Sequence, residues 1–211
     1  MKHRFSSRRS LSNSGFTLVE LLVVIGIIAI LAGVLLSAGT SAIRAAKRAS
    51  AANTASQIQV ACTSYYTEYG VYPIPSTSAG TDYNITDGDE GSWGTLICAL
   101  SGNINPTTGA ATTGNIANTR GISYLSFKAS DVSAAGAPKN PLPYDPAGHP
   151  YYNLAMDGDY NNLLNGLPNF TGVSMGSDPP LNATSTAGVA VWANCNPNTT
   201  TKNPGFWVHT Y

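Results

Sequence analysis

The sequence contains few charged residues and few cysteines for its length. Asp, Glu, Lys and Arg make up 10% of its 211 residues, and the formal net charge is zero. Three cysteines are too few for a small disulfide-rich scaffold, so a folded domain here needs an apolar core. Proline is absent from residues 16–71 although the chain has 13 prolines, so no proline interrupts a helix there. One long helix and one small domain fit these absences.

Side chains arranged for catalysis are also scarce. The three histidines, His3, His149 and His209, lie far apart in the sequence, and none belongs to a His-Glu-x-x-His helix. No Gly-Lys phosphate-binding loop occurs, and no Cys-x-x-Cys pair offers a zinc site. We therefore expect a structural protein and not an enzyme.

A basic leader (residues 1–15) precedes a long apolar run. Residues 21–36 contain no polar side chain, inside a mainly apolar stretch of 16–38. About 20 apolar residues cross a bilayer core of roughly 30 Å, whereas a secretory signal has a shorter run of about 7–15 residues. The run therefore predicts a retained membrane helix, with the leader on the cytoplasmic side by the positive-inside rule. The charged residues of the leader are all basic: Lys2, Arg4, Arg8 and Arg9.

The junction Gly15-Phe16-Thr17-Leu18-Val19-Glu20 resembles the processing site of the type IV pilin and type II secretion pseudopilin superfamily. The resemblance implies that a membrane prepilin peptidase cuts between Gly15 and Phe16 and methylates the new amine of Phe16. It also implies that the processed chain polymerises through its N-terminal helix. The alternative is a plain signal anchor that contains a glutamate by chance.

Glu20 is the one charged residue of the apolar stretch, and a carboxylate in hydrocarbon usually marks function. It lies four residues after Phe16, one helical turn along the same face. The resemblance suggests that the amine of an incoming subunit pairs with Glu20 of a neighbour, although the two groups of one subunit could also neutralise each other. Desolvation offsets much of this attraction, so we expect the pair to fix the axial register more than to add stability.

Helical character continues beyond the membrane run. Residues 41–59 are rich in Ala, Arg, Lys and Gln, which favour helix, and Gly70 with Pro73 predicts its end. We expect four segments: a leader (1–15), a membrane or filament-core helix (16–39), its periplasmic continuation (40–70) and a globular head (71–211) with a long irregular loop (76–120). Apolar residues at helical spacing predict the face that packs on the head: Ile58, Ala61, Cys62, Tyr65 and Tyr69.

The head contains several short apolar segments flanked by turn residues. Residues 150–155, 188–193 and 206–211 are aromatic or β-branched and predict strands, and residues 93–100 predict a short helix or strand. We therefore predict an α+β fold in which the long N-terminal helix packs on a small antiparallel sheet, as in pilins.

Three further segments of the head resemble the major pseudopilin of type II secretion. They are Tyr69-Gly70-Val71-Tyr72-Pro73, Val189-Ala190-Val191-Trp192, and residues 142–151, in which Ala147 replaces a tryptophan of the family. The resemblance implies a structural subunit of a secretion pseudopilus, in which copies of this chain and other pseudopilins form a helical filament. It also implies prepilin peptidase and the inner-membrane secretion platform as partners, with the head in the periplasm.

Two alternative functions remain open at this stage. One is a surface type IV pilus subunit for adhesion, motility or DNA uptake, and the other is a membrane-anchored binding module that carries a prepilin leader. We expect no nucleic acid as a general partner, because the chain after Gly15 has seven basic and eleven acidic residues and repels phosphate.

The resemblance also implies calcium in a C-terminal loop. Asp157, Asp159 and Asn161 offer oxygen ligands at alternate positions, like the start of a calcium loop. The alternative is a hydrated turn held by the same side chains.

Export to an oxidising periplasm would permit one disulfide among three cysteines. Cys98 with Cys195 is the expected pair, because Cys62 falls on the packing face of the helix. The alternative is that all three cysteines are small buried apolar residues.

Overall fold

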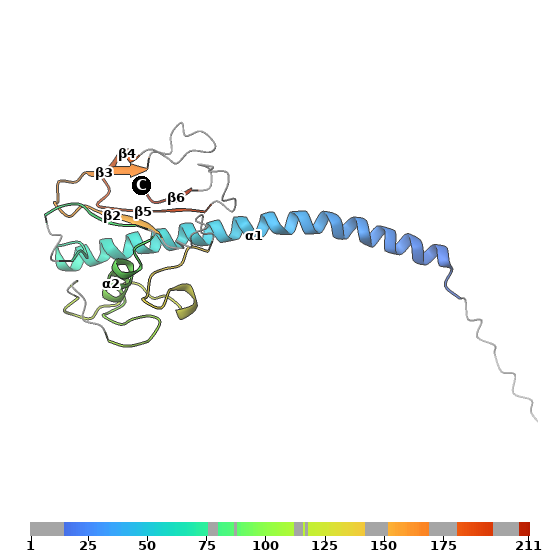
Figure 1. Cartoon of the computed structure of the whole chain (residues 1–211), viewed down its shortest axis with the longest axis horizontal. Coiled ribbons are helices and arrows are strands. Elements are labelled where there is room, and N and C mark those ends of the chain that lie inside the picture. The colour runs from blue at the N-terminus through green and yellow to red at the C-terminus, as the bar shows by residue number, and fades with distance from the viewer. Residues whose placement is uncertain are drawn as a thin grey trace, which may run out of the picture. The chain divides into compact units, whose positions relative to one another are not determined.

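The computed structural model describes residues 15–75, 80–86, 88–111, 116, 118–141, 152–168, 181–195 and 207–211. It has the predicted α+β architecture, in which the long helix α1 (Leu18–Tyr69) precedes a small antiparallel sheet (Figure 1). The chain divides into two compact units, Met1–Ile43 and Arg44–Tyr211, and α1 contributes to both. The predicted leader, apart from Gly15, lies outside the described residues.

Helix α1 ends where the sequence predicts. Gly70 follows Tyr69 with a φ of 71°, a left-handed conformation that glycine adopts without steric cost. Its N–H donates to the Tyr66 carbonyl at 2.7 Å and closes the last turn. The predicted packing face is confirmed, since its first four residues are at most 2% exposed and Tyr69 packs against them. Two small residues extend this face towards the N-terminus: Ala51 and Ala55.

The second unit has three layers, in which a four-stranded sheet lies between a layer of helices and a β-hairpin. The sheet order is β1-β2-β5-β6, and all neighbours are antiparallel. One face packs with α1 and α2 (Glu90–Leu100) in the main core, and the other face packs with the hairpin β3–β4 in a second, smaller core. The alternation of strand side chains explains both cores, because Leu154 faces the helices and Ala155 faces the hairpin. The strands are β1 (Tyr83–Ile85), β2 (Asn153–Met156), β3 (Leu164–Pro168), β4 (Leu181–Ser185), β5 (Val189–Asn194) and β6 (Trp207–His209).

The three predicted strands correspond to β2, β5 and β6, and residues 93–100 belong to the helix α2. Asp89 caps this helix, since its carboxylate accepts the Ser92 N–H at 3.0 Å. Trp93 on α2 is fully buried, and its indole N–H donates to the Tyr152 carbonyl at 2.7 Å. This hydrogen bond connects the helix layer to the start of β2.

The segment 76–120, predicted as an irregular loop, also contains strand β1. Three residues are too few for an alternating pattern, and β1 forms only because Ile85 pairs with Leu154, far along the chain. The sequence analysis also missed β3 and β4. Gly166 interrupts β3 with a φ of 71°, and the β3–β4 register shifts twice, so no regular period is present to find.

Candidate functional site

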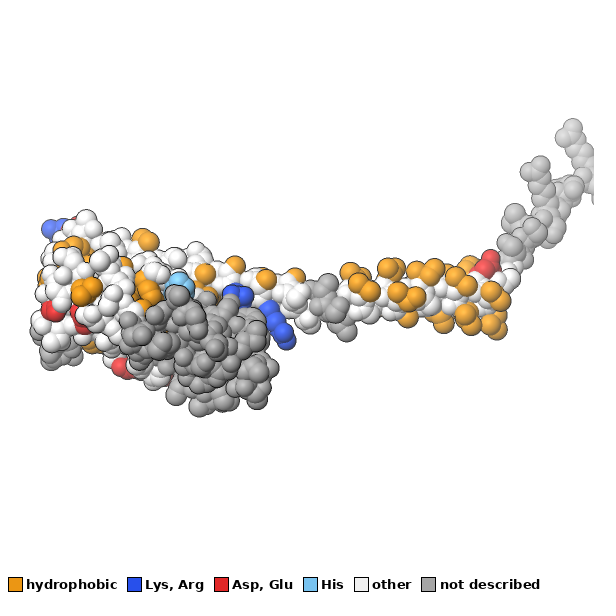
Figure 2. All heavy atoms as spheres, turned by 90° about the horizontal axis from the view of Figure 1, so that it is seen from above, with side chains coloured by type: hydrophobic (Ala, Val, Ile, Leu, Met, Phe, Trp, Pro, Cys, Tyr) orange, Lys and Arg blue, Asp and Glu red, His pale blue; other side chains and the backbone are white. Residues whose placement is uncertain are grey.

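The N-terminal part of α1 exposes its apolar side chains to the surroundings. Phe16 is 75% exposed, and the large apolar side chains from Leu18 to Leu35 are between 44% and 79% exposed. Figure 2 shows these side chains along the visible face of this part of the helix. By length and composition α1 is long and apolar enough to cross a membrane, and none of its most apolar window is buried within the chain. Such a surface needs lipid or protein around it.

Glu20 and Thr17 cap the start of this helix. The Glu20 carboxylate accepts the Thr17 N–H at 2.8 Å and the Thr17 hydroxyl at 2.7 Å. In return, the Thr17 hydroxyl oxygen accepts the Glu20 N–H at 3.2 Å. This reciprocal pattern is a capping box, which satisfies N–H groups that have no partner within the helix. Glu20 therefore has a local structural role in addition to the predicted pairing with the Phe16 amine.

Gly15 lies directly before this cap. A side-chain carbon at Gly15 would meet no atom within 4 Å, and its φ is not left-handed. The fold of the chain therefore does not require glycine at this position. A requirement for glycine would have to come from an enzyme that binds this segment.

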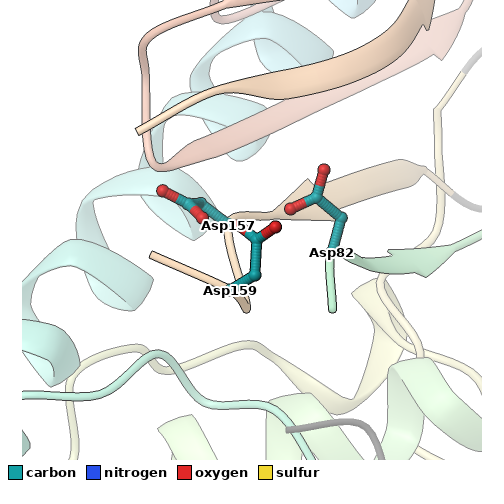
Figure 3. A group of neighbouring side chains, drawn as sticks. All are labelled: Asp82, Asp157 and Asp159. Atoms are coloured by element: carbon teal, nitrogen blue, oxygen red, sulfur yellow. The ribbon is translucent and has the colours of Figure 1, made fainter. Parts of the chain in front are cut away.

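Three carboxylates converge at one end of the four-stranded sheet (Figure 3). Asp157 and Asp159 follow β2, and Asp82 precedes β1. The register pairs Tyr83 with Met156, so the antiparallel strands bring the residue before β1 beside the residue after β2. One carboxylate oxygen from each aspartate lies within 4.8 Å of the other two.

The backbone after β2 wraps around the carboxylate of Asp157, which is 2% exposed. Its two oxygens accept the N–H groups of Asn161 at 3.2 Å and Asn162 at 2.9 Å. Tyr160 and Asn162 have φ values of 58° and 59°, which non-glycine residues adopt rarely. These contacts hold the turn in a tight loop around the buried carboxylate.

The side chain of Asn161 stabilises this turn through two hydrogen bonds. Its side-chain oxygen accepts the Leu163 N–H at 2.7 Å, and its amide group donates to Asp159 at 2.9 Å. Of the three predicted calcium ligands, the structure therefore brings together Asp157 and Asp159. Asp82 supplies the third carboxylate, and Asn161 orients one of the other two.

The carboxylate cluster is electrostatically unfavourable without a cation. Burial raises the pKa of Asp82 above its usual value, and the neighbouring carboxylates of Asp159 and Asp157 raise it further. Hydrogen bonds from the backbone of Asn165 and Gly158 lower the pKa in part. One oxygen of Asp82 is buried without a hydrogen-bond partner. An all-oxygen donor set with an unsatisfied carboxylate fits a hard divalent cation such as calcium.

The three cysteines are buried thiols and are not joined in a disulfide. Cys62 and Cys195 belong to the main core, and the Cys195 thiol donates to the Asn140 side-chain oxygen at 3.6 Å. Burial raises the pKa of the Cys195 thiol to about 11, so the unreactive thiol form predominates. The Cys98–Cys195 pair expected from the sequence is not formed in this structure.

Two sequence patterns lie outside the described residues. One is the turn of residues 142–151, which resembles the pseudopilin turn. The other is residues 172–176, which have the Gly-x-Ser-x-Gly spacing of a nucleophilic serine and which the sequence analysis overlooked when it found no catalytic motif. That spacing indicates catalysis only at a turn from a strand to a helix.

Comparisons with known proteins agree with the N-terminal features. Residues 11–36 match the prokaryotic N-terminal methylation motif. The chain is 39% identical to the fimbrial protein EcpC of Eikenella corrodens over 66 residues, which are 31% of this chain. It is 42% identical to the type IV major pilin protein PilE of Neisseria gonorrhoeae, also over 66 residues and 31% of this chain. The matched parts are 43% and 40% of those relatives, less than half of either length. No solved structure matches the chain. The chain therefore carries the prokaryotic N-terminal methylation motif and is similar to these two pilus proteins over part of its length.

Proposed function

We propose that this chain is a structural subunit of a type II secretion pseudopilus, anchored in the inner membrane and polymerised through its N-terminal helix. The observation that carries the proposal is the exposed apolar surface of α1 from Leu18 to Leu35, with one carboxylate, Glu20, at its start. Helices packed in a filament would cover this surface as lipid does before assembly. The role is structural, and the energy for assembly comes from another protein.

Processing by prepilin peptidase is the first step of this proposal. The matched methylation motif includes Gly15 and Phe16, and the leader before them is basic, which favours a cytoplasmic leader and a periplasmic head. The processed chain then begins at a methylated Phe16. Mass spectrometry of the N-terminal peptide from the native host tests the position of the cut and the methyl group.

We expect Gly15→Val to block processing without changing the folded head. The chain itself leaves open space at Gly15, so a valine affects only the peptidase that must accommodate this residue. The intact mass of the membrane-bound chain should remain that of the precursor, and its circular dichroism should match that of the wild type. A mature mass for the valine variant would contradict the proposed cut.

Subunits of surface pili are the second candidate, because both named relatives are pilus proteins. The turn after α1 and the pattern of β5 favour the pseudopilin type instead, by resemblance. Two measurements in the native host distinguish the two candidates: protein secretion after deletion of the gene, and the presence of the subunit in surface fibres sheared from the wild type. A pseudopilus subunit is needed for protein secretion and is absent from sheared surface fibres, whereas a pilus subunit is recovered in those fibres. A chain that stays monomeric and never copurifies with a filament would overturn both.

We also propose that the cluster of Asp82, Asp157 and Asp159 binds calcium. The three carboxylates and the buried, unsatisfied oxygen of Asp82 support this assignment. The cation would neutralise their repulsion and connect the start of β1 to the end of β2. Its role here is structural.

We expect calcium to raise the Tm of the full chain in detergent, and Asp82→Asn to remove most of this shift. Calcium at 100 times its Kd stabilises a folded state by about 2.7 kcal/mol, or roughly 5–10 °C for a chain of this size. Differential scanning fluorimetry with calcium or with a chelator measures the shift. Asp131→Asn removes an exposed carboxylate outside the cluster and should keep the full calcium shift. Equal shifts in the two variants, or none in the wild type, would contradict the site.

A further inference from the structure

A polar pocket lies between α1 and the segments 126–131 and 139–141 of the second unit. Its volume is about 620 Å³, and it shares no lining residue with the carboxylate cluster. Pockets of about 300–1,000 Å³ are typical of small-molecule sites. The size therefore suits a small ligand and not an extended polymer.

Helix α1 supplies one wall of this pocket. Ser50, Thr54 and Gln57 line it at spacings of four and three residues, so they share one face of the helix. The neighbouring residues Ala51 and Ala55 point into the main core and are fully buried. The helix thus packs through one face and presents hydroxyl and amide groups to the pocket with another.

The charge of the pocket is opposite to that of the chain around it. Three of the four lysines that follow Gly15 line the pocket, namely Lys47, Lys128 and Lys139, together with a single acid, Asp131. The chain after Gly15 otherwise has an excess of acidic residues. A cationic pocket on such a chain favours a small anion.

The lysines are available to a ligand. Among the residues that the structure describes, neither Lys47 nor Lys128 has an ion-pair or hydrogen-bond partner, and the one ion pair joins Arg120 to Glu68. The Lys139 ammonium donates to the Ser130 carbonyl at a long 3.4 Å. No ion pair within the described chain therefore neutralises these charges.

We propose that this pocket binds a small anionic carbohydrate, that is, a sugar with a phosphate or carboxylate group. The lysines supply charge-assisted hydrogen bonds to the anion, and Asn53 and Gln57 supply donors and acceptors for sugar hydroxyls. Phe127 also lines the pocket, and its partly buried ring offers an apolar surface to the sugar ring. This function goes beyond filament assembly and does not depend on it.

The test uses the full chain in a zwitterionic detergent that has no sugar headgroup. Glucose 6-phosphate, glucuronate, glucose, inorganic phosphate and a short single-stranded oligonucleotide are titrated by calorimetry, and saturation-transfer NMR detects weak binding. We expect the two anionic sugars to bind at least about tenfold more tightly than glucose or inorganic phosphate, because both the charge and the hydroxyls contribute.

Lys128→Gln and Arg120→Gln form a matched pair, since each removes one positive charge from an exposed side chain and only Lys128 lines the pocket. Lys128→Gln should weaken binding of glucose 6-phosphate about tenfold, and Arg120→Gln should leave it unchanged. Unchanged Tm values establish that both variants are folded. Four outcomes would each overturn the proposal: no binding of anionic sugars, equal binding of inorganic phosphate, tighter binding of the oligonucleotide, or equal effects of the two substitutions.

Discussion

Glu20→Gln is expected to abolish filament assembly while leaving the start of α1 intact. Glutamine fits the same capping box as glutamate, so the hydrogen bonds with Thr17 can persist without the charge. An amine at Phe16 would then have no carboxylate in the packed helices. A buried charge that loses its partner costs about 3–5 kcal/mol, which weakens assembly by two orders of magnitude or more. The fraction of processed chain that sediments as filament measures the loss.

Thr17→Val supplies the matched control for this experiment. It removes the capping hydroxyl and keeps the charge of Glu20, at a cost of about 1 kcal/mol to the start of the helix. We expect this variant to assemble. Filaments of normal yield from Glu20→Gln, together with poor assembly of Thr17→Val, would show that Glu20 acts as a helix cap and not as an assembly charge.

Gly94→Ala is expected to destabilise the head strongly, although alanine is the better helix former. A methyl group at Gly94 would overlap the carbonyl oxygen of Ala135, and both the helix and that segment are held in the core. Overpacking typically costs about 1–3 kcal/mol, and a clash with backbone atoms belongs at the upper end of this range, so we expect the Tm to fall by roughly 6–12 °C. Thermal unfolding followed by near-ultraviolet circular dichroism reports this change in the packed aromatic side chains.

Gly91→Ala makes the same substitution in the same helix. The nearest atom to the added methyl group is a carboxylate oxygen of Asp89 at 3.8 Å, an ordinary contact. We therefore expect Gly91→Ala to leave the head as stable as before or to stabilise it by up to about 1 kcal/mol. A loss of stability as large as that of Gly94→Ala would show that the close approach to Ala135 is not the cause.

The sequence predicts those parts of the fold that depend on local patterns. The proline-free stretch and Gly70 predict α1 and its end, and the packing face around Cys62 follows from helical spacing. The strands β2, β5 and β6 are apolar segments bounded by turn residues. In contrast, β1 forms only through its partner β2, and no pattern within Tyr83–Ile85 indicates it.

The carboxylate cluster is likewise only partly predictable from local sequence patterns. Asp157 and Asp159 are visible in the sequence because they are close together, whereas Asp82 joins them only through the register of β1 and β2. The capping box is different, because Thr17 and Glu20 have the Thr-x-x-Glu spacing that signals it. The sequence analysis considered only the charge of Glu20 and did not predict its role in capping the helix.

The position of the capping box has a consequence for the conformational entropy of assembly. The groups of the capping box, the Thr17 amide and hydroxyl and the Glu20 carboxylate, follow the expected cut after Gly15. Removal of the leader would therefore leave these three hydrogen bonds of the first turn intact. A chain cut at this position would join its neighbours with its first turn already ordered, so backbone freedom at that end would not be lost again when the proposed subunit docks.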